Sequence, residues 1–96
     1  MTTVPYLLVR HKIKDFDKWK LIFDNYSTIR EAGGSKGGLL FRNTDDPSEI
    51  VAIFKWDTIE NARKFAESEN LKKRMQVAGI TEKPDIYILE EVERVV

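Results

Sequence analysis

The hydrophobic pattern of the chain predicts four β-strands and three helical segments. The strands are expected over residues 4–13, 39–43, 49–56 and 85–92. The last two strands are apolar on both faces, as strands in the middle of a packed structure are. A turn-forming sequence, NTDDPS at residues 43–48, separates the second and third strands. Aspartates there are typical of a solvated turn rather than of a metal site.

Alternation along the first strand assigns its side chains to two opposite faces. Leu7, Val9 and His11 point to one face, whereas Leu8 and Arg10 point to the other. If the first face packs on the helices, His11 lies at the edge of that layer and Arg10 lies on the far side of the sheet. The two side chains therefore do not share a pocket.

Apolar residues at spacings of three and four predict one long helix after the first strand. Asp15 is expected to be its N-cap and Gly33 its C-terminal stop. The apolar stripe consists of Phe16, Trp19, Ile22, Phe23, Tyr26 and Ile29. Trp19 lies within this stripe, which favours a place in the core.

The second helical region is expected in two pieces. Asp57 and Glu60 have the spacing of a capping box, which predicts that a helix begins there. Ser68 is expected to cap the second piece, which would end at Gly79 with Leu71, Met75 and Ala78 on its buried side.

Residues 33–38, GGSKGG, are expected to form a flexible connector. A glycine-rich loop also suggests phosphate binding. However, this one follows a helix and precedes a strand, which is the reverse of the order in phosphate-binding loops. Helix capping and turn geometry are therefore the favoured explanation.

The element order β-α-β-β-α-β predicts an α+β protein with the ferredoxin-like fold. Both helical regions would cover one face of a four-stranded antiparallel sheet and leave the other face bare. Because strands 49–56 and 85–92 are apolar on both sides, a monomer would expose hydrophobic surface. A homodimer formed sheet against sheet is expected. The alternative is a monomer that binds its ligand or partner on the open sheet.

Composition narrows the possible partners. The 96 residues contain 16 basic and 16 acidic side chains, so no global charge attracts nucleic acid. The chain has no cysteine, which excludes disulfides and thiolate chemistry. No apolar run has the length of a membrane span and no signal peptide is evident. We expect no nucleic-acid or membrane partner and a cytoplasmic location.

Six motifs distributed along the chain carry a resemblance to a known family: VRHKIKDFDKWK (9–20), AGGSKGG (32–38), DDP (45–47), WD (56–57), AGI (78–80) and PDIYILEEV (84–92). Through them nearly the whole chain resembles the dimeric α+β barrel superfamily, and within it the antibiotic biosynthesis monooxygenase (ABM) group. These motifs match a subgroup of small members rather than any enzyme of the family. The resemblance implies a single domain over residues 1–96 and a cavity beside each sheet. It does not by itself imply catalysis.

Two branches of this superfamily differ in their chemistry. Haem-degrading members hold iron with a histidine on a helix and have an asparagine in the first strand. Here the only histidine, His11, is in a strand and that strand has no asparagine. This branch is disfavoured. Cofactor-independent monooxygenases oxidise electron-rich phenols in an apolar cavity, which polar and aromatic side chains line. Residues of those types are present in this chain: His11, Arg42, Asn43, Trp56 and Tyr87.

His11 is the candidate catalytic residue. The ordinary pKa of histidine, near 6.5, suits a general base at neutral pH. The alternative is a structural histidine that hydrogen-bonds a backbone carbonyl or Asp15.

The candidate ligand-binding residues are cationic or aromatic. Arg10 and Arg42 suit a carboxylate or phenolate, although a strand-end arginine such as Arg42 is also common on surfaces. Phe54 and Trp56 share a strand face and suit an aromatic wall, for which core packing is the simpler explanation. Tyr87 offers a hydroxyl, to a cavity or to solvent.

Three functions are consistent with the sequence. The first is a monooxygenase-like or cyclase/isomerase-like enzyme that acts on a small aromatic or polyketide-like molecule, without metal, flavin or other cofactor. The second is a non-catalytic dimer that binds a small hydrophobic ligand. The third is a structural or interaction module.

Overall fold

A four-stranded antiparallel sheet with strand order β2-β3-β1-β4 organises the molecule. The computed structural model describes residues 4–77 and 83–96. The elements are β1 (Pro5–Lys12), α1 (Phe16–Asn25), α2 (Ser27–Gly33), β2 (Ser35–Arg42), β3 (Glu49–Trp56), α3 (Ile59–Ala66), α4 (Glu69–Val77) and β4 (Asp85–Glu90). Ala78, Gly79 and the AGI motif at 78–80 lie outside the described residues.

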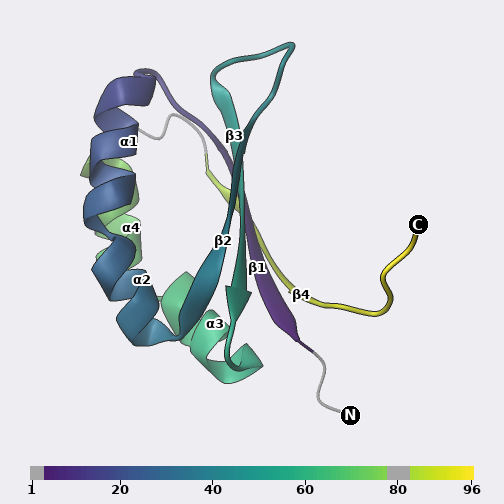
Figure 1. Ribbon diagram of the computed structural model, residues 1–96. Helices are drawn as coiled ribbons and strands as arrows, with labels where there is room; N and C mark the ends of the chain where they lie inside the picture. Colours follow the sequence, from purple (N-terminus) through teal and green to yellow (C-terminus); the bar gives the residue numbers. More distant parts are fainter. Residues whose placement is uncertain (1–3, 78–82) are drawn as a thin grey trace.

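This arrangement confirms the predicted ferredoxin-like fold. The helices lie on one side of the sheet, and the C-terminal residues after β4 extend from its other side (Figure 1). We call the covered side of the sheet the helix face and the opposite side the open face. Each strand of the sheet therefore has one side that the helices cover and one side that is bare.

The strand register brings the core together on the helix face. Leu7 of β1 pairs with Phe54 of β3, and Val9 pairs with Ala52. All four side chains are buried, and Trp56, 1% exposed, continues this cluster along β3. The predicted parity of the first strand is therefore confirmed.

The predicted long helix is interrupted at Tyr26. Asp15 caps α1 as expected, since its Oδ1 accepts a hydrogen bond from the Lys18 backbone N–H at 3.2 Å. Tyr26 has φ −86° and ψ −3°, and its N–H points to the carbonyls of both Ile22 and Phe23. Such bifurcated bonds are common at helix ends, where the last turn tightens. The expectation of one continuous helix is wrong in this detail.

The prediction of a flexible connector at residues 33–38 is also wrong, because β2 begins within this stretch at Ser35. Gly34, rather than Gly33, caps α2, with φ 123°, a conformation that glycine adopts without strain. Ser35 then pairs with Trp56 and Gly38 with Phe54, with an irregularity in register between the two pairs. The stretch is therefore a bulged edge strand and not a flexible loop.

Gly38 is expected to tolerate no side chain. A Cβ at this position would overlap the Ile53 carbonyl oxygen and approach the Phe54 Cα to 2.8 Å, so the β2–β3 pairing would have to separate. We expect Gly38→Ala to lower the free energy of unfolding by about 2 kcal/mol or more, measured by urea denaturation.

Gly33→Ala is the matched control for this prediction. Its Cβ would make ordinary contact with the Trp56 ring at 3.5 Å, and alanine favours the helix. We expect it to leave stability unchanged or slightly raised. Equal stability of the Gly38→Ala and Gly33→Ala proteins would contradict the close approach of the strands.

Of the two predicted N-caps in the second helical region, the one for α3 is wrong and the one for α4 is confirmed. Thr58, not Asp57, is the N-cap of α3, and its Oγ1 accepts from the Asn61 N–H at 3.0 Å. Asp57 instead accepts two contacts at 3.0 Å from the Asn61 side-chain amide. The predicted capping box is therefore wrong. Ser68 caps α4 as expected, accepting from the Leu71 N–H at 3.1 Å.

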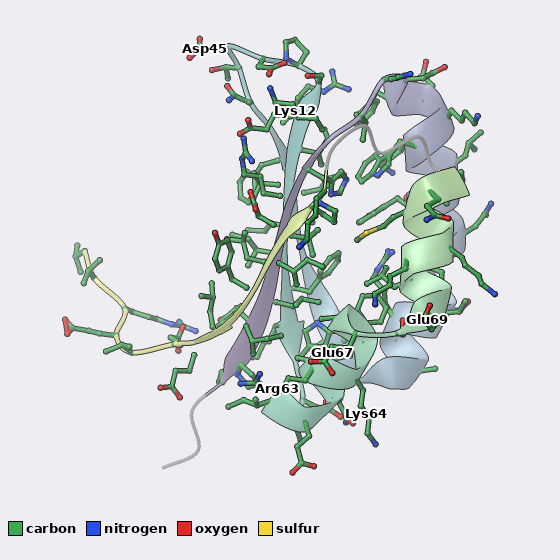
Figure 2. The ribbon with its side chains drawn as sticks, turned by 180° about the vertical axis from the view of Figure 1, so that it is seen from behind. Lys12, Asp45, Arg63, Lys64, Glu67 and Glu69 are labelled. Atoms are coloured by element: carbon green, nitrogen blue, oxygen red, sulfur yellow. The ribbon has the colours of Figure 1, made fainter. Side chains whose placement is uncertain are left out.

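Asp45 of the β2–β3 turn and the charged side chains of α3 are exposed, with both signs represented. Asp45 lies at the tip of the β2–β3 hairpin, which confirms a solvated turn (Figure 2). Around the end of α3, Arg63 and Lys64 lie near Glu67, so charges of both signs are present there (Figure 2). Among the described residues, no cluster of three or more metal-ligating side chains is present. None of the helices in the described ranges is long and apolar enough to span a membrane.

Candidate functional site

An apolar cavity of about 70 Å³ lies between the helix face of the sheet and the helices. Its walls include the aromatic rings of Trp19, Phe23, Tyr26, Phe54 and Phe65. Trp19 and Phe23 stack with ring centroids 4.9 Å apart, and Phe23 stacks on Phe54 at 5.9 Å. The spacing of three and four residues places Trp19, Phe23 and Tyr26 on one side of α1 and its C-cap. Phe54 of β3 lies opposite them.

A wider groove of about 830 Å³ adjoins the cavity between α2 and β2. The two spaces share three wall residues: Phe23, Arg30 and Phe54. Polar groups of Ser27 and Ser35 also line the groove, in contrast to the apolar cavity. The cavity therefore meets an open polar groove where these three residues lie.

Arg30 is the cationic residue of this junction. Its side chain is 9% exposed, and Nη1 donates a hydrogen bond of 2.8 Å to the Phe23 carbonyl oxygen. The guanidinium carbon lies 4.1 Å from the centre of the Phe23 ring and 5.1 Å from that of Phe54. Stacking of this kind is favourable for a guanidinium, which is planar and weakly hydrated.

Arg30 was not among the candidates predicted from the sequence, although the hydrophobic pattern contained a signal. Phe16, Trp19, Phe23 and Tyr26 set a repeat of three and four residues, and Arg30 is the next position in it. A charged residue on an apolar stripe is seldom left without a specific role. Burial lowers the pKa of Arg30 from its ordinary value, with Asp24 and Tyr26 opposing the shift.

His11 is buried beside the cavity but is not part of its wall. The side chain is 6% exposed, and its ring centroid lies 5.4 Å from that of Trp19, a wall residue. Neither ring nitrogen has a hydrogen-bond partner among the described residues. The expected bond to Asp15 or to a backbone carbonyl is therefore not formed there. Burial lowers the pKa of His11 to about 4.

This low pKa predicts loss of stability in mild acid. The unfolded chain binds a proton on His11 near pH 6.5, whereas the folded protein does so only near pH 4. The free energy of unfolding should therefore fall as the pH decreases from 6.5 to 4, by about 3 kcal/mol from this group. Below pH 4 both states are protonated and the contribution is constant.

The measurement is urea denaturation across this pH range for the unmodified protein and His11→Phe, which should lose this part of the pH dependence. Because His11 is the only histidine, its imidazole proton resonance also gives the pKa directly. An imidazole that titrates near pH 6.5 in the folded protein would contradict the burial.

Two of the sequence candidates lie on the open face, away from the cavity. Arg10 forms ion pairs with Glu49 at 2.8 Å and Asp85 at 3.0 Å, which join three strands of the sheet. Tyr87 is 55% exposed on the same face. As predicted from parity, Arg10 and His11 are on opposite sides of the sheet.

The remaining candidates are on the helix face, in different surroundings. Phe54 lines both the cavity and the groove. Trp56 is packed in the core, with its ring centroid 5.0 Å from that of Phe65, and its Nε1 has no partner in the described part of the chain. Arg42 lies near the strand end with its guanidinium carbon 3.7 Å from the centre of the Phe16 ring. Of the sequence candidates, the structure places only Phe54 on the cavity wall.

The sheet order and the helix layer define a ferredoxin-like α+β protein, and known structures share this fold. A candidate antibiotic biosynthesis monooxygenase from Bordetella bronchiseptica matches with a TM-score of 0.78 and 13% identity, over 96% of this chain and all of its own. Another from Caulobacter crescentus gives a TM-score of 0.75 and 12% identity, over 95% of this chain and 92% of its own.

A third structure with this fold is described as a dimer. A dimeric ferredoxin-like protein from an uncultured marine organism has a TM-score of 0.63 and 13% identity, over 99% of this chain and 93% of its own. These structures confirm the fold implied by the resemblance to ABM-like proteins. No protein-family model matches the sequence, and no curated protein matches it either.

Proposed function

We propose that this protein is a small enzyme of the cofactor-independent, monooxygenase-like or cyclase/isomerase-like kind. Its substrate is a small aromatic or polyketide-like molecule. The observation that carries the proposal is the aromatic cavity beneath α1, which meets an open groove at Arg30. The names of the Bordetella and Caulobacter proteins support the same class.

The roles of the residues follow from their surroundings. Phe23 and Phe54 hold an aromatic ring, and Arg30 stabilises negative charge that develops on the substrate. In oxidation without a cofactor, the substrate supplies the electrons to O₂. One oxygen atom then enters the substrate as a ketone in place of two hydrogens, and the other leaves as water.

His11 is the proposed general base, since it is neutral at pH 7 and its ring nitrogens have no hydrogen-bond partner among the described residues. Trp19 must move for it to reach a substrate, because His11 contacts Trp19 and does not line the cavity.

Oxygen consumption with hydroquinone-type substrates tests the enzymatic proposal. We expect turnover in the unmodified protein and at least a tenfold loss in Phe54→Ala, provided the variant folds. Tyr87→Phe, on the open face, is the matched control and should retain full activity. Full activity in His11→Ala would remove His11 from the mechanism but leave the site in place.

A non-catalytic role in binding a small hydrophobic ligand is the alternative. Among the described residues that line the cavity there is no histidine or carboxylate, which favours this alternative. Native mass spectrometry that detects a copurified small molecule, without oxygen consumption, would support this alternative. If the protein binds no small molecule at all, it is a structural or interaction module.

We also propose that two copies associate sheet to sheet, as in a dimeric α+β barrel, each a single domain of residues 1–96. The register aligns Leu39, Ile53, Leu8 and Tyr87 in one row across the open face. Leu39 is 65% exposed in the single chain, and a row of this kind is seldom left in water. The dimeric ferredoxin-like neighbour supports this assembly. The cytoplasm is the proposed location.

A further inference from the structure

Arg30 is a buried cation that forms no ion pair with a described carboxylate, and Asp24 acts on it only from beyond ion-pair distance. Among the described residues, no Asp or Glu oxygen lies within ion-pair distance of its guanidinium. The one hydrogen bond it makes there, to the Phe23 carbonyl, uses one of five guanidinium N–H groups. Burying a charge without a partner is costly, and an anionic ligand would offset that cost.

The groove next to Arg30 offers further donors. Ser27 and Ser35 contribute hydroxyls, and Gly37 contributes a backbone N–H that makes a 3.3 Å bond to Ser35 Oγ. Because β2 is an edge strand with an irregular register at Ser35–Gly38, its outer backbone groups have no strand beside them. Two hydroxyls and the backbone groups of an edge strand, N–H and C=O alike, therefore line the groove that contains Arg30.

The charges of the groove favour a monoanion. Arg30 and Lys36 are cationic and Glu31 is anionic, which leaves one net positive charge among the wall residues. A phosphate dianion would not be neutralised there. A carboxylate is ionised at pH 7, and its two oxygens match the planar guanidinium.

The two volumes decide how such a ligand would lie. The cavity of about 70 Å³ is roughly half the size of a cavity of about 150 Å³ that admits benzene. It therefore accepts only part of a ring, while the groove of about 830 Å³ has room for the remainder and its polar group. Phe23 and Phe54 line both spaces and would contact the ring at the junction.

We propose that the groove between α2 and β2 binds the carboxylate of an aromatic acid, with Arg30 as the anion-binding residue and the ring directed into the aromatic cavity. This inference rests on the proposed function, since it uses the same cavity. It adds the substrate class: an aromatic monocarboxylate.

The test compares 2-naphthoate with its uncharged counterpart, 2-naphthylmethanol, by isothermal titration calorimetry. We expect the unmodified protein to bind 2-naphthoate about 10- to 100-fold more tightly than the alcohol. Arg30→Met should abolish this preference without weakening the alcohol more than twofold, and Arg30→Lys should keep a small part of it. Arg63→Met, on the outer surface of α3, is the control and should change neither affinity (Figure 2).

A second measurement needs no variant and covers the case in which Arg30→Met fails to fold. In ¹⁵N–¹H spectra of the unmodified protein, 2-naphthoate should shift the Arg30 Nε–H and the Gly37 and Gly38 amide signals. The alcohol brings the same ring to the junction but no carboxylate, so it should not move the Arg30 Nε–H signal downfield as a charge-assisted hydrogen bond does.

Equal affinity for the two probes, or an equal loss for both in Arg30→Met, would overturn the inference while leaving the apolar cavity as a binding site. Carboxylate binding through Arg30 without oxygen consumption would retain the inference and remove the monooxygenase activity. Failure of both probes to bind would overturn the inference and the proposed binding site together.

Discussion

Replacing Trp56 by alanine is expected to lower the free energy of unfolding by about 3–5 kcal/mol. Trp56 is 1% exposed and is the largest of the fully buried side chains in the described part of the chain. Its ring packs against Phe65 and lies beside Gly33 at the end of α2, so it joins β3 to two helices. Truncation would open a cavity that these rigid elements cannot close. Urea denaturation measures the effect.

Two further variants separate packing from other roles of Trp56. Trp56→Phe keeps most of the volume and removes an Nε1–H group that has no partner in the described chain, so its cost should be much smaller. Lys55→Ala, at the exposed neighbouring position, should change stability by less than about 0.5 kcal/mol. A Trp56→Ala protein of unchanged stability would show that Trp56 is not a core residue.

Replacing Ile53 by glutamate is expected to abolish the proposed sheet-to-sheet dimer. Ile53 is half-buried at the centre of the open face, between Leu39 of β2 and Leu8 of β1. In a sheet-to-sheet dimer the new carboxylate would be buried without a partner, whereas in a monomer it reaches water. Light scattering should give twice the chain mass of 11.2 kDa for the unmodified protein and the single chain mass for the variant.

Thr28→Glu is the control for charge, since it places the same carboxylate on the exposed surface of α2, away from the open face. It should remain a dimer. A single-chain mass for the unmodified protein, or a dimeric Ile53→Glu protein, would contradict association through this face.

Much of the fold could be predicted because it depends on local periodicity. Alternation along residues 4–13 placed Leu7, Val9 and His11 on the helix face and Arg10 on the open face, as observed. The helix beginnings at Asp15 and Ser68 were also predictable, because N-cap hydrogen bonds span only three residues. The choice between Asp57 and Thr58 was not, since both are good caps one residue apart.

The start of β2 required tertiary information. Glycines favour turns when they are considered alone, and the sequence 33–38 contains four of them. In the fold, Ser35 and Gly38 pair with β3, and Gly38 is needed because the β3 backbone is too close for a Cβ. A close approach between strands leaves no sign in the sequence of either strand alone.

The candidate site was likewise predictable only in part from the sequence. The sequence supplied a list of reactive and aromatic residues, and only Phe54 of that list lines the cavity. Arg30 was overlooked because its importance arises from distances to Phe23 and Phe54, which lie seven and 24 positions away in the chain.

By itself, the sequence determined the order of strands and helices, the two faces of the sheet and the exposure of an apolar surface, because these follow from periods of two and 3.6 residues. The tertiary structure alone decided which side chains surround the cavity, why His11 is neutral and why the Arg30 cation is buried beside aromatic rings. Such properties depend on burial and on distances between separate elements, which no local pattern encodes.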